Sequence, residues 1–446
     1  YKTYLKEKNI MKSKRKILSL AVLLSVTLFG CSETTVKNSE SVESVKSDEN
    51  NQDISESSEN NKIQITIGSI EFNGDLINII NSFNKSNSQY EIITKDYHDG
   101  DSTVTDMQNN IKIDLVSGKA PDIIICDDSS FYYTLSSKDV FMDISDYISE
   151  NNMEILPNII DVCTENNGNI YRLPLGFNVL CGICKEEYGT DHTEIYNYKK
   201  MQNVFENLDN DVVFSTDMKA AVYRTKESII TDFIDLKSFK SSFDSPEFAD
   251  ALEFYKQLQN TDYDFTADDT IYVNGKAHIL YATLGNTRDI YHIKNHNFKD
   301  TDIVMTPPEN AKISLDRSVS IINSSSEDVK QGAFEFLKYA LSDEFVNTVT
   351  PIYFPVTKSG FEISLESEFD VFYEKESEKA KLSEEEKTTI SDYIQKVNHE
   401  TTYDTTIKDI FTEETKAYLD NNLYSAEECG DIINQRVQLY LDEQKN

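Results

Sequence analysis

The sequence predicts an α/β protein with two lobes, and three observations support this. Strand-like and helix-like segments alternate between residues 63 and 126. The third of these strands contains the continuous apolar run Ile123-Ile124-Ile125, which is typical of a parallel strand covered on both faces. The 416 residues from Cys31 to Asn446 are more than one hydrophobic core usually supports. We therefore expect a doubly wound α/β lobe followed by a second lobe.

Residues 1–30 have the pattern of a secretion signal. We expect Met11 to be the true initiator, and the basic residues Lys12, Lys14, Arg15 and Lys16 precede the apolar stretch 17–29. This stretch is too short for a membrane span, which needs about 20 apolar residues. Gly30 before Cys31 fits the box at which bacterial lipoproteins are cleaved. We expect Cys31 to be lipidated and to anchor the chain to the outer face of the cell membrane. An ordinary secretion signal with an incidental cysteine is the alternative.

Residues 31–61 are predicted to form a disordered tether. The segment is rich in Ser, Glu and Asn and has no aromatic residue, so it cannot bury enough apolar surface to fold. The whole chain has a formal net charge of −35, and residues 31–446 carry −41 because residues 1–30 carry +6. Such a charge argues against nucleic acid as a partner and against peripheral binding to anionic lipid. The predicted membrane anchor must therefore be covalent.

The elements of the first lobe follow from apolar periodicity. A strand at 63–67 precedes a helix with the apolar face Leu76, Ile79, Ile80 and Phe83. A strand at 90–94, a helix that Gly118 ends, and a strand at 122–126 complete the βαβαβ order. Ligands of such sheets bind beyond the carboxyl ends of the strands. In this chain those ends are residues 69–73, 96–98 and 127–130.

The remaining chain is predicted to be more helical. Ser245 and Pro246 suit the N-cap and first position of a helix. Further helices are expected at 334–341 and after Ser425. Residues 374–387 are charge-rich, and we expect them to be a helix with a solvated face.

Motifs for catalysis are missing from the sequence. It has no GxSxG, HExxH, P-loop or GxGxxG pattern. Cys181 and Cys184 have redox or zinc spacing, but no second ligand pair follows and we expect a strand there. His292 and His296 lack an acidic partner between them, so we expect no metal site. We predict a binding protein without a cofactor, and not an enzyme.

Several segments resemble family 1 extracellular solute-binding lipoproteins of bacterial ABC importers, the group that includes maltose-binding protein. The likeness extends from about Lys62 to Glu443 and rests on the order and spacing of individually weak motifs. One departure is the missing glycine-rich turn around residues 306–318. The matching segments are Phe83-Asn84-Lys85-Ser86-Asn87, Ser117-Gly118-Lys119-Ala120-Pro121-Asp122-Ile123-Ile124, Gly168-Asn169-Ile170-Tyr171-Arg172-Leu173-Pro174, Phe243-Asp244-Ser245-Pro246-Glu247-Phe248, Asn274-Gly275-Lys276-Ala277, Tyr424-Ser425-Ala426-Glu427-Glu428 and Gln435-Arg436-Val437-Gln438-Leu439-Tyr440.

The resemblance implies the two-lobed, type II periplasmic-binding-protein fold, with a hinge and a ligand cleft between the lobes. Lobe one would be 62–177 plus 306–355, and lobe two 178–305 plus 356–446. The crossing segments would lie near 175–179, 305–315 and 354–358. Hinge closure would follow ligand binding, and a membrane permease would read the closed form.

The resemblance also implies a function, namely capture of a sugar or oligosaccharide and its delivery to an ABC permease. A surface adhesion or signalling protein that keeps the fold without transport is the alternative. Side chains on the aligned cleft loops can exchange hydrogen bonds with ligand hydroxyls. The predicted ligand-binding residues are Glu71, Asn73, Asp127, Asp128, Ser129, Phe177, Asn178, Asn286, Arg288, Arg317 and Tyr353.

Overall fold

The computed structural model describes most of the chain beyond its first 61 residues. The predicted signal segment, Cys31 and the predicted tether lie outside the described residues. Residues 60–446 form one compact unit. In the described part of the chain, no helix combines the length and apolarity that a membrane crossing needs. The described residues are 62–98, 100, 102–193, 198–207, 229–259, 270–273, 279–299, 301–346, 352–373, 376–402 and 404–445.

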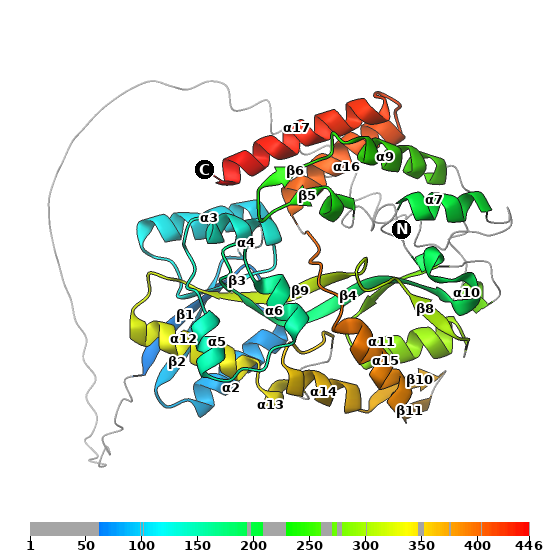
Figure 1. Cartoon of the computed structure of the whole chain (residues 1–446). Coiled ribbons are helices and arrows are strands. Elements are labelled where there is room, and N and C mark those ends of the chain that lie inside the picture. The colour runs from blue at the N-terminus through cyan, green and yellow to red at the C-terminus, as the bar shows by residue number, and fades with distance from the viewer. Residues whose placement is uncertain are drawn as a thin grey trace, which may run out of the picture. The chain divides into compact units, whose positions relative to one another are not determined.

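A seven-stranded mixed sheet forms the centre of the molecule (Figure 1). Its order is β2-β1-β3-β9-β4-β7, and β8 pairs with β4. β1 is parallel to β2 and β3, whereas β9 runs antiparallel to both β3 and β4. The three strands predicted in the first lobe are thereby confirmed. The strands are β1 (Ile63–Ser69), β2 (Tyr90–Asp96), β3 (Ile123–Cys126), β4 (Leu173–Lys185), β7 (Leu280–Leu284), β8 (Ile303–Met305) and β9 (Lys312–Ile321).

Among the helices of the first half, α2 and α3 have side-chain caps at their starts, and the predicted C-cap Gly118 is confirmed. Asn73 caps α2 by accepting a hydrogen bond from the Leu76 N–H. Thr103 and Asp106 form a capping box at the start of α3, and Gly118 ends this helix in the left-handed region with φ 70°. The helices of this half are α2 (Gly74–Ser86), α3 (Val104–Ser117), α4 (Ser129–Ser136), α5 (Ser145–Glu150) and α6 (Pro157–Cys163).

The second half is mainly helical, as predicted. Helices occur at 246–259, 327–340 and 426–445, which confirms the three predicted from apolar periodicity. Cys181 and Cys184 lie on β4, and both are free and buried. The elements are η1 (Glu186–Tyr188), η2 (Thr190–Thr193), α7 (Tyr198–Asn207), β5 (Ile234–Asp235), β6 (Lys240–Ser241), α9 (Pro246–Gln259), α10 (Thr270–Val273), α11 (Thr287–His292), η3 (Ile293–Asn297), α12 (Glu327–Ala340), α13 (Asp343–Val346), α14 (Lys358–Glu366), α16 (Thr405–Leu419) and α17 (Ala426–Lys445).

The prediction of one helix over 374–387 was wrong. β10 (Phe369–Tyr373) and β11 (Glu376–Ala380) form an antiparallel hairpin, and α15 (Glu384–Ile394) begins only after it. β10 contains aromatic and β-branched residues, which favour a strand. Its partner β11 tolerates charged residues because it is an edge strand exposed to solvent. The charge-rich composition alone did not reveal this pairing.

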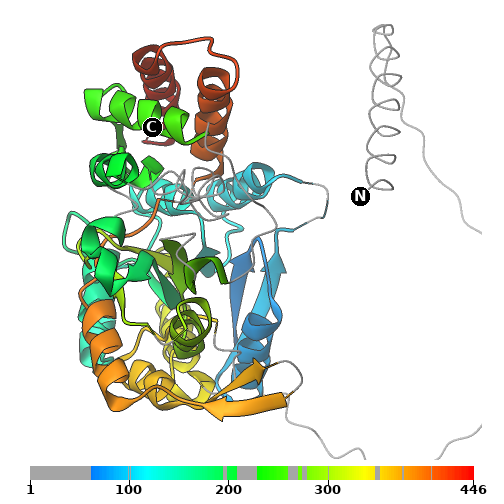
Figure 2. The ribbon, with the colours of Figure 1, turned by 90° about the vertical axis from the view of Figure 1, so that its right-hand side faces the viewer.

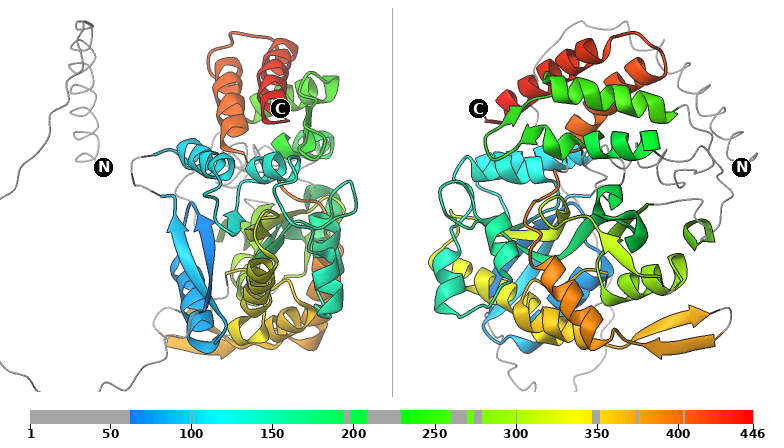
Figure 3. Two further views of the ribbon diagram at one scale, coloured as in Figure 1. Left: turned by 90° about the vertical axis from the view of Figure 1, so that its left-hand side faces the viewer. Right: turned by 45° about the vertical axis from the view of Figure 1, so that its right-hand side comes forward.

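Two clusters of buried apolar side chains stabilise the fold. The first joins the sheet to α2, α12, α14 and α15. The second joins α3 and α4 to a helical layer made of α9, α16 and α17. Figures 2 and 3 show this helical layer on the far side of α3 and α4 from the sheet. β4 and β9 pair along most of their length, so the sheet is continuous across the position where we placed the first lobe boundary. The lobe boundaries themselves stay a prediction.

Gly332 on α12 should be sensitive to the smallest enlargement. A Cβ there would lie 2.4 Å from Tyr90 Cδ1 and 2.5 Å from Ile65 Cδ1, whereas one on Gly74 would meet nothing within 4 Å. We expect Gly332→Ala to lower the free energy of unfolding by about 1–3 kcal/mol relative to Gly74→Ala, because overpacking a buried contact strains the core. Urea denaturation of both variants measures this difference. Equal stabilities would contradict the packing described around α12.

Candidate ligand-binding site

Arg317 on β9 brings several predicted site residues together. Its backbone N–H donates to Asp127 Oδ1 at 2.7 Å, and its Nη1 donates to Asn73 Oδ1 at 3.1 Å. Its Nε pairs with Asp316 Oδ2 at 2.5 Å, and its guanidinium carbon lies 5.7 Å from the ring centroid of Tyr353. These five residues are named the Arg317 cluster. They lie beyond the carboxyl ends of β1 and β3, where the fold predicts ligands.

Asp127 is the most electrostatically perturbed member of the Arg317 cluster. Its side chain reaches solvent, but protein surrounds it closely. Desolvation, together with the neighbouring carboxylates of Asp316 and Glu71, raises its pKa to about 6, although the hydrogen bond from Arg317 acts in the opposite direction. An accessible carboxylate in such surroundings can accept hydrogen bonds from a ligand.

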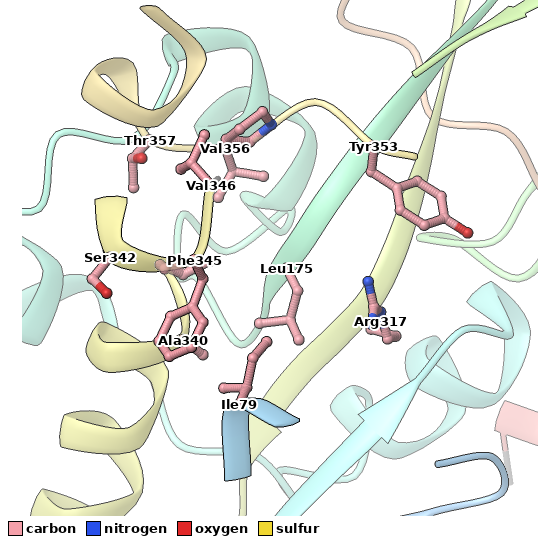
Figure 4. Close-up of a pocket in the computed structure, with 12 residues that line it drawn as sticks. Ile79, Leu175, Arg317, Ala340, Ser342, Phe345, Val346, Tyr353, Val356 and Thr357 are labelled. Atoms are coloured by element: carbon pink, nitrogen blue, oxygen red, sulfur yellow. The ribbon is translucent and has the colours of Figure 1, made fainter. Parts of the chain in front are cut away.

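The cavity at the Arg317 cluster is small. Arg317 and Tyr353 lie at one side of it, and Ile79, Leu175 and Phe345 contribute apolar walls (Figure 4). Its volume is about 80 Å³, far below the roughly 300–1,000 Å³ that is usual for ligand sites. The Arg317 cluster therefore lacks an enclosed site of its own in this conformation.

Asp128 and Ser129 follow Asp127 but point elsewhere. Asp128 is buried and caps α4 by accepting a hydrogen bond from the Phe131 N–H at 2.9 Å. The Ser129 Oγ lies 3.5 Å from Glu400 Oε1, and the residue lines a second cavity. The start of α4 thus separates three consecutive predicted site residues into three environments.

This second cavity lies between segments from both predicted lobes and is named the inter-lobe cavity. Its volume of about 480 Å³ falls within the range usual for ligand sites, roughly 300–1,000 Å³. Predicted lobe one supplies Ser129, Tyr133, Asp161, Val162 and Lys312. Predicted lobe two supplies Thr231, Asp232, residues 234–237 and residues 398–402.

Glu400 is held rigidly in the wall of the inter-lobe cavity. Its Oε2 accepts hydrogen bonds from Arg172 Nη2 at 2.6 Å and from the Tyr133 hydroxyl at 3.1 Å. The Arg172 side chain is only 2% exposed, and its guanidinium stacks 3.9 Å from the ring centroid of Tyr132. Arg172 and Tyr133 therefore fix a carboxylate that remains 14% exposed. A fixed acceptor in a partly desolvated wall is suited to binding donors on a ligand.

Other residues that line the inter-lobe cavity are also paired polar groups. Lys312 Nζ lies 2.8 Å from Asp232 Oδ1, and the Thr402 N–H donates to Thr231 Oγ1 at 2.8 Å. Burial and the neighbouring Lys312 lower the pKa of His399. A ligand in this cavity would thus meet groups whose geometry is already set by protein partners.

Four other predicted residues lie away from the inter-lobe cavity. Phe177 is fully buried and packs on Phe354, so it is a core residue in this structure. The Asn178 Oδ1 is buried without a described partner. Asn286 caps α11 in a capping box with Asp289. Arg288 lines a separate cavity of about 620 Å³.

Sequence reasoning missed the residues that hold the inter-lobe cavity together. Tyr133 and Arg172 belong to motifs that the sequence does contain, the aromatic run 131–133 and the segment 168–174. Glu400 and Lys312 gave no local signal, because their importance depends on partners far along the chain. Among the described residues, no group of three or more His, Cys, Asp or Glu side chains could hold a metal ion.

Known structures share the fold of this chain. A sugar-binding protein MalE from the phytopathogen Xanthomonas citri has a TM-score of 0.55 at 11% identity, and the alignment covers 85% of this chain and 98% of that one. An ABC substrate-binding protein from Listeria monocytogenes in complex with cycloalternan has a TM-score of 0.52 at 13% identity, with 86% and 100% covered. A periplasmic oligogalacturonide-binding protein from Yersinia enterocolitica has a TM-score of 0.53 at 12% identity, with 86% and 100% covered.

The family follows from the sequence match. The family model described as bacterial extracellular solute-binding protein matches residues 78–362, more than half of the chain. This chain belongs to that family, which confirms the resemblance found in its motifs. No curated protein matches the chain.

Proposed function

We propose that this chain captures a sugar or oligosaccharide in the inter-lobe cavity. The observation that carries the proposal is Glu400, a carboxylate fixed by Arg172 and Tyr133 in the wall of a 480 Å³ cavity. Carboxylates accept hydrogen bonds from hydroxyl groups, and a fixed one binds them without losing side-chain entropy. The solved structures of the same fold include proteins named for sugar, cycloalternan and oligogalacturonide.

The wider role that we propose is that of the binding component of an ABC importer. Lipidated Cys31 would anchor the chain, and the 31–61 tether would hold its folded part roughly 30 Å from the membrane on average. The two predicted lobes would close on the ligand, and the membrane permease would recognise the closed form. Closure requires that the ligand bind the closed form more tightly than the open form.

A glycan panel tests the proposal. Isothermal titration with cycloalternan, maltotriose and an oligogalacturonide is combined with small-angle scattering of the same samples. We expect at least one glycan to bind and to reduce the radius of gyration, because a ligand held by both predicted lobes favours closure. Free amino acids serve as the comparison set for small polar ligands. Absence of heat and of compaction with every glycan would contradict the proposed function.

A further inference from the structure

Two buried carboxyl groups interact electrostatically beside the segments that line the inter-lobe cavity. Asp128 and Asp404 are 7% and 4% exposed. Each caps its own helix: Asp128 accepts a hydrogen bond from the Phe131 N–H in α4, and Asp404 accepts one from the Ile407 N–H in α16 at 2.7 Å. Buried acids normally have a cationic partner, because an isolated buried charge is costly. This pair is named the acid pair.

Among the described residues, the side chains that contact the acid pair are uncharged, and the nearby cation Lys112 donates to another group. From α17, the Tyr440 hydroxyl donates to Asp404 Oδ2 at 3.0 Å. From α3, Lys112 attracts both acids, but its Nζ donates to Gln444 Oε1 at 3.0 Å. The pKa of Lys112 is lowered by its burial and by the charge of Lys138, which lies beyond the end of α4. Gln108 on α3 and Ser130 on α4 are the uncharged polar neighbours.

Burial and mutual repulsion make the acid pair bind a proton more tightly than isolated carboxyl groups do. Desolvation, followed by the charge of Asp404, raises the pKa of Asp128 to about 7. Desolvation also raises the pKa of Asp404. Two carboxyl groups that interact in this way share one proton, and the raised pKa belongs to the pair.

The position of the acid pair links it to the cavity. α4 begins at Ser129, which lines the cavity, and α16 begins at Thr405, three residues after the lining segment 398–402. α4 belongs to predicted lobe one and α16 to predicted lobe two. A motion that opens the cavity between these two ends would separate Asp128 from Asp404 and return both to water.

We propose that the acid pair is a proton-dependent latch, in which the closed form holds one proton shared by Asp128 and Asp404 and opening releases that proton to solvent. Ligand affinity at the proposed site therefore falls as the pH rises. This inference rests on the proposed function for its effect on ligand, but the latch itself is a property of the chain without ligand.

The sign of the effect follows from proton linkage. The pKa of a solvated aspartate is about 4, and the closed form raises that of the pair. Between about pH 4 and pH 7 the closed form holds up to one proton more than the open form. The equilibrium constant for closure therefore falls by at most tenfold for each unit that the pH rises. Above and below this range the two forms bind equal numbers of protons, and the dependence levels off. We expect a loss of affinity of at least tenfold from about pH 5 to pH 8.

The first test uses the chain without ligand. Carbon-13 NMR titration of the aspartate carboxyl groups should show one group of the acid pair titrating near pH 7. Small-angle scattering should show a smaller radius of gyration at about pH 5 than at pH 8. Titration of both acids near their ordinary pKa of about 4, or a radius of gyration that does not change with pH, would overturn the latch.

Variants assign any pH dependence to the acid pair. Asn caps helices as well as Asp does, so the double variant Asp128→Asn/Asp404→Asn keeps both caps and removes both titrating groups. Asp127, with a pKa of about 6, and His399, with a lowered pKa, remain unchanged in the double variant. We expect its affinity for the panel glycans to vary less than about threefold over the same pH range. Asp420→Asn is the control, because Asp420 lies at the exposed C-terminal end of α16. This variant should keep the pH dependence of affinity seen in the wild type.

The two proposals fail in different ways. If no panel glycan binds at any pH but the carboxyl titration and the scattering change as expected, the proposed function fails and the latch stands. If a glycan binds with an affinity independent of pH, the latch fails and the proposed function stands.

Discussion

Replacing Arg172 by methionine should lower the free energy of unfolding by about 3–5 kcal/mol, because it leaves a largely buried carboxylate without its counter-charge. The Arg172 guanidinium is 2% exposed and lies 2.6 Å from Glu400, which is itself 14% exposed. The substitution also removes the stack on Tyr132 at 3.9 Å. Urea denaturation followed by circular dichroism measures the change.

Two comparisons isolate the buried charge in this experiment. Lys338→Met breaks an ion pair with Glu335 that is 41% and 31% exposed, and it should cost no more than about 1 kcal/mol. The double variant Arg172→Met/Glu400→Gln should recover part of the loss, because no unpaired charge remains. A cost for Arg172→Met as small as that for Lys338→Met would contradict the described role of the buried ion pair.

Glu400→Gln should weaken glycan binding by about 10- to 100-fold, since hydrogen bonds to a charged acceptor contribute about 1.5–3 kcal/mol. The amide keeps the size of the side chain but removes its charge. It also leaves Arg172 without its partner, so the affinity is measured by isothermal titration below the melting transition of the variant.

Other variants separate binding from folding. Ser129→Ala keeps the Arg172–Glu400 pair and should reduce affinity by a smaller factor, about 2- to 10-fold. Glu386→Gln alters an ion pair with Lys294 outside the inter-lobe cavity and should leave affinity unchanged. Full affinity in folded Glu400→Gln would place the ligand elsewhere.

Local sequence patterns were sufficient to predict much of the fold. β1, α2 and β3 follow from apolar periodicity and from caps that act over a few residues, such as Asn73 and Gly118. The hairpin at 369–380 did not follow, because the pairing of β11 depends on its neighbour β10 more than on its own charged residues.

The candidate site was less predictable, because its geometry depends on distant partners. Asp127 and Asp128 are adjacent in sequence, but the turn into α4 directs the first to Arg317 and the second to the acid pair. Glu400 becomes a candidate binding residue only because Arg172, 228 residues earlier, pairs with it. A local sequence pattern cannot include both residues, and the amino-acid composition does not reveal that they are in contact.

A crystal structure of the chain grown with the tightest-binding panel glycan tests the central claim most directly. We predict a sugar in the inter-lobe cavity, with a hydroxyl within about 2.5–3.0 Å of the Glu400 carboxylate. A glycan bound only at the Arg317 cluster or beside Arg288, with Glu400 contacting no sugar atom, would contradict the claim.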